Sequence, residues 1–275
     1  MKIKFIAIDL DGTLLKDNRI STGNEEAIKM AIERGAQVAI VTGRVYTSPR
    51  FYMEQMGIRL PTIAGNGAVI VAPDGKVRVV RPMPEEKARE ILKVCDEKDL
   101  AYHFYDQDTY YAKTYTSVLL EHLKAGEDEA AGFQTSLNIS RSCMERAIQR
   151  GQGITKIVVD VLDRSKIPEV RRIFQDLKGV EMVQSGSRSL EFMAVGVNKY
   201  SGLELYLDSI GISMDTLCAI GDYENDLPMI KNAAFGVAMG NAIEPVKEAA
   251  QFITKTNEED GVAFAIHEMI NRGYL

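Results

Sequence analysis

The pattern of apolar and polar positions at the start of the chain predicts alternating strands and helices. Residues 3–9 form a continuous apolar run, and residues 36–43 form another. Between them, residues 21–35 have a Ser/Thr cap, acids in the first turn, apolar residues at helical spacing and a closing glycine. A strand, a helix and a strand without hairpin signals predict a parallel pair joined by a right-handed crossover.

The pattern of apolar and polar positions then changes. Residues 69–80 consist of two β-rich runs around Asp74-Gly75, which predicts a hairpin. From about residue 83, an amphipathic helix (84–99) precedes alternating aromatic and polar residues that are typical of antiparallel strands (101–113). The stretch "KAGEDEAAG" (124–132) is expected to be a solvated loop. Further helices and strands are expected over 155–161, 165–178, 180–186 and 189–195.

The last part of the chain again alternates helices and strands, as the first part does. The expected elements are a helix (199–211), a strand (216–222), a helix (224–233), a strand (235–240) and two more helical segments. The whole pattern predicts an α/β fold, in which a doubly wound parallel-sheet (Rossmann-like) core carries an inserted α+β domain. We expect the core to comprise residues 1–82 and 193–275, and the inserted domain residues 83–192.

Composition and charge narrow the class of protein. A content of 45% hydrophobic and 26% charged residues is that of a globular protein, and no apolar run approaches the roughly 18 residues of a membrane span. We therefore expect a cytoplasmic protein with no membrane partner. The net charge of −6 argues against nucleic acid as a partner, and three distant cysteines do not suggest a disulfide framework. The pattern does not select an oligomeric state.

Polar residues follow the predicted strands of the core, at the edge where the carboxyl ends of parallel strands gather functional groups. Two acids follow the first strand, a Thr-Gly pair follows the second, and a second acidic cluster follows the strand that begins near residue 216. A lysine opens the helix before that last strand. These residues are Asp9, Asp11, Thr42, Gly43, Lys199, Asp222, Asn225 and Asp226.

Two carboxylate pairs at one sheet edge would repel each other unless a cation lies between them. A hard divalent cation such as Mg²⁺ resolves this conflict, and Mg²⁺ in such sites usually shares its ligand shell with a phosphate. Taken singly, an Asp-Gly turn, a Thr-Gly turn or a lysine at a helix start is ordinary; their joint placement favours a phosphate site. There an Asp can attack phosphorus, and a second acid can protonate the leaving oxygen. In an extended strand end, residues i and i+2 point to the same side, so Asp9 and Asp11 can face one substrate.

Four segments carry a resemblance to a known family. The segments "DLDGTLL" (9–15), "VTGR" (41–44), "GVNKYSGL" (196–203) and "GDYENDLPM" (221–229) resemble the four ordered motifs of the haloacid dehalogenase-like hydrolase superfamily. The segments "NGA" (66–68) and "GNAIEPVKEAAQFITKTNEEDGVAFAI" (240–266) are similar to its Cof-type phosphatases, which carry a large α/β cap between the second and third motifs. The inserted domain resembles that cap only in position, size and texture.

The resemblance implies a role for each matching position. Asp9 would be the nucleophile and Asp11 the general acid/base. Mg²⁺ would be held by the Asp9 carboxylate, the Asp11 carbonyl and Asp222, with Asp226 orienting the metal shell. The phosphoryl group would be held by the Leu10 amide, Thr42, Gly43, Lys199 and Asn225. An acid at position 11 favours phosphatases or phosphomutases over the dehalogenases and transport ATPases of the superfamily.

The expected substrate is a small phosphorylated metabolite, with sugar phosphates as the leading class. Its specificity is expected in the cap, which can close over the site. Candidate substrate contacts near the site are Arg44, Tyr46, Asn66, Gly67 and Arg188. The cap aromatics Tyr102, His103, Tyr105, Tyr110 and Tyr111 are also candidates, although such side chains more often pack a small sheet.

Other catalytic classes leave no trace in the sequence. It contains no GxSxG elbow, no GxxxxGK[ST] loop and no GxGxxG turn after the first strand, and its three histidines lack metal-ligand spacing. Two alternatives to a phosphatase remain open on the same fold. One is a phosphomutase that returns the phosphoryl group to its substrate, and the other is a catalytically idle regulator that binds a phosphorylated metabolite.

Overall fold

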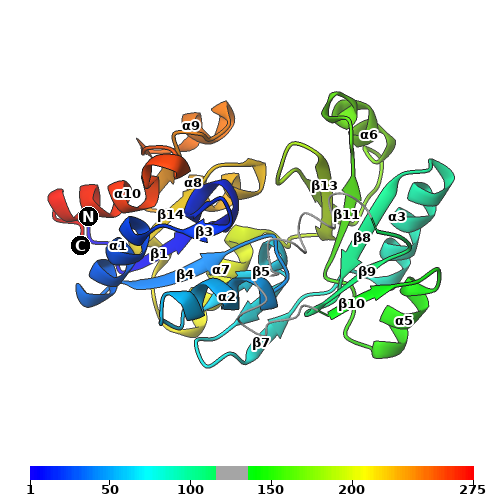
Figure 1. Cartoon of the computed structure of the whole chain (residues 1–275), viewed down its shortest axis with the longest axis horizontal. Coiled ribbons are helices and arrows are strands. Elements are labelled where there is room, and N and C mark those ends of the chain that lie inside the picture. The colour runs from blue at the N-terminus through cyan, green and yellow to red at the C-terminus, as the bar shows by residue number, and fades with distance from the viewer. Residues whose placement is uncertain (116–135) are drawn as a thin grey trace.

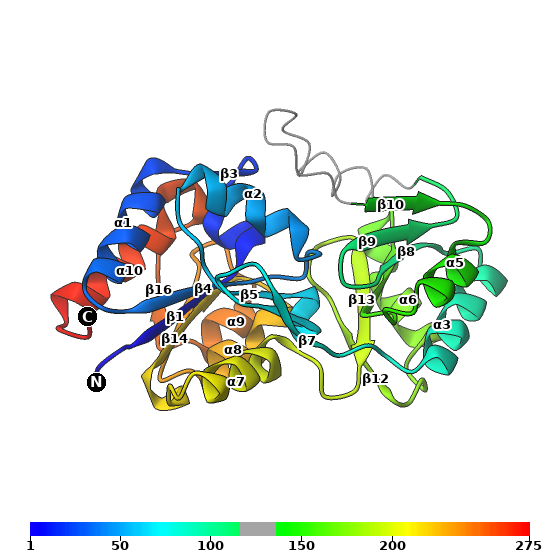
Figure 2. The same ribbon diagram turned by 90° about the horizontal axis from the view of Figure 1, so that it is seen from below.

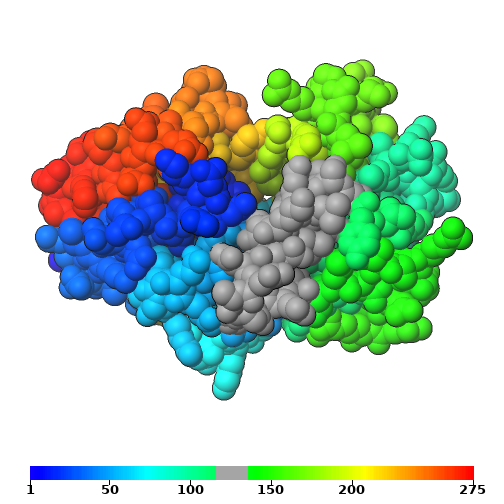
Figure 3. All heavy atoms as spheres, viewed as in Figure 1, coloured from blue at the N-terminus to red at the C-terminus, as the bar shows by residue number. Residues whose placement is uncertain are grey.

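The computed structural model describes residues 1–115 and 136–275, which form two lobes, each built on its own sheet (Figure 1). The expected loop over 124–132 lies outside the described residues. In the space-filling view, a notch along the upper edge separates α9 (Glu244–Ala249) of one lobe from α6 (Ile167–Ile173) of the other (Figure 3). No helix in the described ranges has the length and apolar character needed to cross a membrane.

The core lobe contains an eight-stranded sheet in the order β16-β15-β14-β1-β4-β5-β6-β7. Neighbours from β16 to β5 pair in parallel, and the pairs β5–β6 and β6–β7 are antiparallel. Ile8 is in register with both Ile40 and Ile220, so three strands reach the same edge together. The strands are β1 (Phe5–Ile8), β4 (Gln37–Val41), β5 (Thr62–Ala64), β6 (Val69–Val71), β7 (Val77–Val80), β14 (Leu217–Gly221), β15 (Phe235–Ala238) and β16 (Phe252–Ile253).

Helices cover both faces of this sheet, as a doubly wound fold requires (Figure 2). On one face lie α1 (Thr22–Glu33), α2 (Thr47–Gln55) and α10 (Gly261–Asn271), and on the other lie α7 (Lys199–Ser209), α8 (Leu227–Asn232) and α9. The strands between them are almost wholly apolar; β1 is buried at all four positions. That burial makes β1 a rigid support for the residues that follow it.

The second lobe, which we call the cap, has a six-stranded sheet in the order β10-β9-β8-β11-β13-β12. All neighbours pair antiparallel except β10 and β9. Its helices pack on one face (Figures 1 and 2). The elements are α3 (Glu85–Glu97), β8 (Ala101–Tyr105), β9 (Thr109–Ala112), β10 (Ser136–Ile139), α5 (Cys143–Arg150), β11 (Lys156–Asp160), α6, β12 (Val180–Val183) and β13 (Ser189–Ala194). The predicted fold class, a doubly wound core with an inserted α+β domain, is confirmed.

Some local expectations were wrong. A small hairpin of β2 (Leu15–Lys16) and β3 (Arg19–Ile20) interrupts the first crossover. Its two-residue turn, Asp17-Asn18, has φ angles of 46° and 56°, the left-handed conformation of a type I′ turn. The expected helix over 165–178 ends at Ile173, and the one over 224–233 starts as a 3₁₀ turn, Glu224–Asp226, before α8.

The strand that the argument from alternation assumes does not reach Asp9 and Asp11. β1 ends at Ile8, and residues 10–14 form a tight turn in which Asp11 (φ −78°, ψ 120°) and Gly12 (φ 76°) depart from helical geometry. The shape of that turn, rather than the two-residue period of a strand, sets the direction of the Asp11 side chain.

Candidate active site

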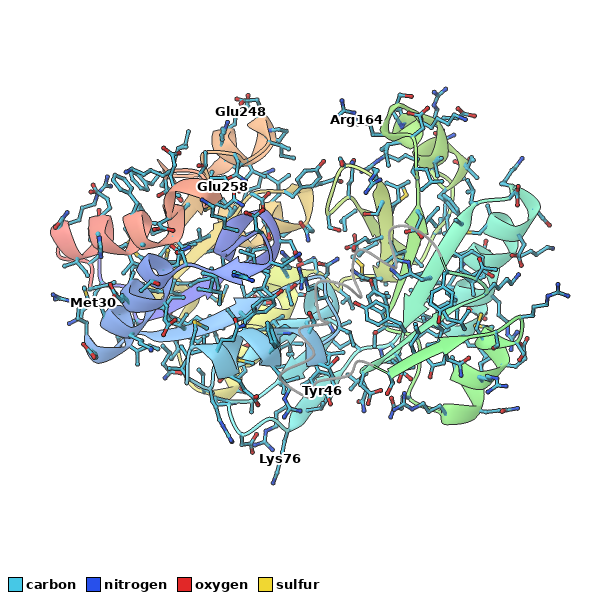
Figure 4. The ribbon with its side chains drawn as sticks, in the orientation of Figure 1. Met30, Tyr46, Lys76, Arg164, Glu248 and Glu258 are labelled. Carbon is cyan, nitrogen blue, oxygen red and sulfur yellow. The ribbon has the colours of Figure 1, made fainter. Side chains whose placement is uncertain are left out.

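A cavity of about 220 Å³ lies between the carboxyl edge of the core sheet and the cap sheet. Side chains from both lobes point into the space between them (Figure 4). From the core, the cavity is lined by Asp9, Asp11, Gly43, Arg44, Asp222, Tyr223 and Asn225. From the cap, it is lined by Tyr105, Tyr110, Lys156, Ser185, Gly186, Ser187, Arg188, Ser189 and Glu191.

Asp9 lies directly beyond β1. Its amide continues the sheet pairing by donating to the Ile220 carbonyl at 3.0 Å, which fixes the backbone. Its side chain is almost buried, and Oδ1 accepts a hydrogen bond from Lys199 Nζ at 2.5 Å. Burial, together with the charge of Asp226, raises the pKa of Asp9 well above its usual value despite the nearby lysine.

Lys199 is the first residue of α7 and is completely buried. The helix begins with a capping box in which Asn198 and Ser201 bond each other's backbone amides, and this fixes the first turn. The ammonium group donates to Asp9 and, also at 2.5 Å, to Asp226 Oδ1. Although burial lowers the pKa of Lys199, the two carboxylates raise it overall, so the lysine is cationic at neutral pH.

The loop after β14 carries the second acidic cluster. Asp226 Oδ2 accepts the amide hydrogens of Asp222 at 2.9 Å and of Tyr223 at 3.1 Å, so this side chain holds the loop in shape. Asp222 Oδ1 accepts from the Thr13 hydroxyl at 3.0 Å. Burial, followed by the charge of Asp226, raises the pKa of Asp222 to about 7.

These carboxylates have the donor set of a hard cation. One oxygen each of Asp9, Asp222 and Asp226 lies within 4.8 Å of the others, and all three residues are buried. Lys199 contributes only one positive charge to this cluster, and both Asp226 oxygens already accept hydrogen bonds. Burial first, and then repulsion from Asp226, raises the pKa values of Asp9 and Asp222, and a bound divalent cation would favour their ionised forms. The residues therefore fit a metal ion held chiefly by Asp9 and Asp222.

Arg44 contacts Asp11, the other predicted catalytic acid. The guanidinium is buried, whereas the Asp11 side chain is 51% exposed. Besides its two hydrogen bonds to the carboxylate, Arg44 donates to Ser48 Oγ at 3.2 Å and to Tyr52 Oη at 3.1 Å. Asp11 and Arg44 both line the cavity, so the acid is held at its wall by a fixed cation.

The expected phosphoryl contacts lie around the same edge at different depths. Gly43 and Asn225 line the cavity. Thr42 is fully buried, and its hydroxyl accepts the Arg44 amide hydrogen at 3.1 Å. The Leu10 side chain is buried in the core cluster, which leaves its backbone amide as the group relevant to a ligand. Asn225 donates to Asn66 Oδ1 at 3.1 Å.

The expected substrate contacts separate into two groups. Arg44 and Arg188 line the cavity. Tyr46, labelled in Figure 4, lies just before α2 and lines a different pocket with Arg50 and Met53. Gly67 is packed against the Asn198 carbonyl so closely that an added Cβ would lie 2.1 Å from that oxygen. Asn66 is buried behind the cavity wall.

The sequence reasoning missed several polar cap residues that line the cavity, notably Lys156 and Glu191. The available signal was a charged residue in a largely apolar strand: Lys156 opens "KIVVD", and Glu191 lies within "SLEFMA". Of the cap aromatics, Tyr105 and Tyr110 line the cavity, whereas Tyr102 and Tyr111 pack in the apolar core of the cap.

Fold and candidate site together define a two-lobed α/β protein with a polar cavity between a Rossmann-like core and its cap. A family model of haloacid dehalogenase-like hydrolases matches residues 6–266, and the chain belongs to this family. It is accordingly an enzyme, a phosphoric monoester hydrolase of the haloacid dehalogenase-like type.

Similar proteins match over nearly their whole length. The 5-amino-6-(5-phospho-D-ribitylamino)uracil phosphatase YwtE of Bacillus subtilis is 30% identical over 99% of this chain and 100% of its own. The 5-amino-6-(5-phospho-D-ribitylamino)uracil phosphatase YcsE of the same organism is 32% identical over 98% of this chain and 96% of its own. A solved haloacid dehalogenase-like hydrolase from B. subtilis has a TM-score of 0.85 at 26% identity, with 97% and 100% of the two chains covered.

Proposed function

We propose that the chain is a Mg²⁺-dependent phosphatase that hydrolyses a small phosphorylated metabolite through an aspartyl-phosphate intermediate. The observation that carries this proposal is the placement of Asp9. Asp9 directly follows a buried strand, and its carboxylate lines the cavity and contacts the buried Lys199 ammonium. A nucleophile needs this fixed aim, because a displacement on phosphorus requires the attacking oxygen to lie in line with the leaving oxygen.

Asp9 would attack phosphorus, and the bond to the leaving oxygen would break. Asp11 would give its proton to that oxygen and later take one from the water that hydrolyses the aspartyl-phosphate. Its partial exposure and its place at the cavity wall support this assignment. Asp11 must then separate from Arg44 during the cycle, because both of its carboxylate oxygens accept hydrogen bonds from the guanidinium and one of them must reach the leaving oxygen instead.

Asp9 and Asp222, with the Asp11 carbonyl, would hold Mg²⁺. When bound, the ion supplies positive charge that stabilises the phosphoryl oxygens as charge develops on them. Asp226 keeps the Asp222 loop and Lys199 in place through its three hydrogen bonds. The phosphoryl group would be bound by the amides of Leu10 and Gly43, by Thr42 and Asn225, and by Lys199.

We infer that residues 83–192 act as the specificity domain and that sugar phosphates are the leading substrate class. The cap side of the cavity is rich in hydroxyl and charged groups, including Ser185, Ser187 and Ser189. Such groups match a leaving group with many hydroxyls. The names of two relatives specify a phosphate on a ribityl chain, which is consistent with this class.

The test is phosphate release from a panel of phosphorylated sugars, sugar alcohols, nucleotides and cofactors, with and without Mg²⁺. We expect Mg²⁺-dependent release from at least one sugar or sugar-alcohol phosphate. The Asp9→Asn variant should lose turnover while it retains its fold, because the raised pKa of Asp9 indicates that a neutral group is tolerated at that position. Retained activity in this variant would sink the assignment of the nucleophile.

The same panel separates the alternatives. A phosphomutase would convert the substrate to an isomer without releasing phosphate. An idle regulator would bind a member of the panel, seen as a rise in melting temperature, and would turn over none of them.

A further inference from the structure

One face of the cap sheet points toward the core, and it carries an ion pair. Residues alternate between the two faces of a strand, so Ile157 and Val159 of β11 lie in the apolar core of the cap, whereas Lys156 lines the cavity. On β13, Leu190 and Phe192 lie in the same apolar core, whereas Glu191 lines the cavity. The register of β11 and β8 supports this orientation of Lys156, because Lys156 pairs with Tyr105, another residue that lines the cavity.

The two charged groups bond each other and also the core. Lys156 Nζ donates to Glu191 Oε1 at 2.6 Å, and the side chains are only 2% and 3% exposed. From the core lobe, Asn66 Nδ2 donates to Glu191 Oε2, also at 2.6 Å. Although burial raises the pKa of Glu191, Lys156 and the hydrogen bonds from Ser185 and Asn66 lower it overall, so the carboxylate is ionised.

The pair lies directly over the loop expected to bind the phosphoryl group. A Cβ placed on Gly43 would lie 3.2 Å from Lys156 Nζ and 3.5 Å from Glu191 Oε2. The missing side chain at position 43 therefore makes room for the charged groups of the cap. If a phosphate is bound at Gly43, the leaving-group atoms nearest the ester bond would contact Lys156 and Glu191.

Stability alone does not account for the pair. Removing two charges from water costs several kcal/mol per ion, and buried ion pairs are often replaced by apolar residues without loss of stability. Both groups also retain hydrogen-bonding capacity. An ammonium has three donors, and in the part of the chain that the structure describes Lys156 uses one of them on Glu191. A carboxylate has about four acceptor sites, and Lys156, Asn66 and Ser185 use three.

We propose that Lys156 and Glu191 recognise a hydroxyl-bearing carbon close to the phosphate ester, so that the enzyme selects polyol and sugar phosphates over esters of plain alcohols. A hydroxyl donates one hydrogen bond and accepts others, which complements a donor and an acceptor held side by side. Asn66 positions Glu191, and Glu191 positions Lys156. The inference rests on the proposed function and deepens it by naming the residues that set substrate class.

The experiment compares two probes that differ only in hydroxyl groups, D-ribitol 5-phosphate and pentyl phosphate. A site whose buried polar groups are left unpaired rejects the analogue strongly. We therefore expect wild-type kcat/KM to favour ribitol 5-phosphate by on the order of 100-fold or more. In the double variant Lys156→Met/Glu191→Gln, kcat/KM for ribitol 5-phosphate should fall by about 10- to 100-fold, whereas that for pentyl phosphate should change by less than about threefold.

The double variant is chosen so that it folds. It keeps side-chain size, retains an acceptor for Asn66 and leaves no unpaired charge in the interior. Glu191→Gln alone is the second variant, because it changes one atom and should also reduce the preference. Lys113→Met is the matched control: this cap lysine is 41% exposed and pairs with Asp96, away from the cavity lining, and both probes should react as in the wild type.

Two results would overturn the inference: an unchanged preference in both folded variants, or an equal loss on both probes, which indicates a structural role. A binding measurement tests this inference even if the proposed phosphatase function is wrong. If the wild type hydrolyses neither probe, titration calorimetry on the Asp9→Asn background still measures affinity for ribitol 5-phosphate. Weaker binding after Lys156→Met/Glu191→Gln supports the pair even then, and equal binding excludes it.

Discussion

Arg44 holds Asp11 through two hydrogen bonds, from Nε to Oδ2 at 2.8 Å and from Nη2 to Oδ1 at 2.5 Å. The guanidinium is itself fixed by Ser48 and Tyr52 of α2 and by burial. A half-exposed carboxylate is thus oriented by a rigid cation in the neighbouring loop. The pair keeps Asp11 at the cavity wall, and in the mechanism proposed above it must open during the catalytic cycle.

Arg44→Met should therefore impair turnover more than binding. Without the guanidinium, Asp11 samples several orientations, and misplacement of a catalytic group by about 1 Å costs on the order of 100-fold. We expect kcat to fall by about 10- to 100-fold with a smaller change in KM, measured by steady-state phosphate release. Arg34→Met, at the exposed end of α1, is the control for loss of an arginine charge. A wild-type kcat in the Arg44 variant would exclude the orienting role.

The raised pKa of Asp222 predicts how the metal-free protein responds to pH. Its pKa is about 7 in the folded state against 3.8 for the free side chain, so between these values the folded state binds more protons than the unfolded state. The free energy of unfolding should therefore decrease as pH rises from about 4 to 7, and this contribution should be constant above that range. Denaturant melts of chelator-treated protein at pH 5, 6, 7 and 8 measure the slope.

Asp222→Asn provides the reference for that measurement, because it removes the titrating group and keeps the side-chain size. The difference in unfolding free energy between the two proteins reports the titration of Asp222 together with the effect of its charge on the pKa of Asp9. We expect the wild type to lose stability relative to the variant as pH rises through this range. A difference that does not depend on pH would contradict the assignment of the raised pKa.

Removal of the metal should abolish phosphatase activity and lower the free energy of unfolding at neutral pH. Adding back Mg²⁺ should restore activity and raise the unfolding free energy by about 2.7 kcal/mol at a concentration 100 times the dissociation constant. The Asp222→Asn variant should lose most of this increase, whereas Glu248→Gln, an exposed acid in α9, should keep it. Activity that survives complete chelation would rule out metal dependence.

The sequence predicts the core well because its signals are local. Residues 3–9, 21–35 and 36–43 have the periodicities of a strand, a helix and a strand, and β1, α1 and β4 form there. β16 was missed because two residues are too few to show a period. The hairpin at Asp17-Asn18 was missed because its strands are equally short, although Asn and Asp are the residues that tolerate a positive φ.

The candidate site was predictable only in part, for a different reason. Asp9, Asp222 and Lys199 follow or precede strands in recognisable motifs, and strand order brings them to one edge. The contacts that refine the site join distant parts of the chain: Arg44 to Asp11, and Lys156 to Glu191. Side-chain direction decides such contacts, and it depends on the exact shape of the turn over 10–14 and on how the cap docks, which residue spacing does not encode.

Lys199 gives the sharpest test of the electrostatics of the site. It is the buried cation between Asp9 and Asp226, so Lys199→Met leaves two buried carboxylates without their cationic partner. We expect the metal-free variant to lose about 3–5 kcal/mol of unfolding free energy, measured by denaturant titration.

The double variant Lys199→Met/Asp226→Asn removes one charge of each sign and should recover much of that loss. It should nevertheless stay inactive, because the phosphoryl group still lacks its buried cation. Lys247→Met, on the surface of α9, should leave both properties unchanged. If the double variant were as unstable as the single one, repulsion among the carboxylates would not be the cause, and if it were active, Lys199 would have no part in binding phosphate.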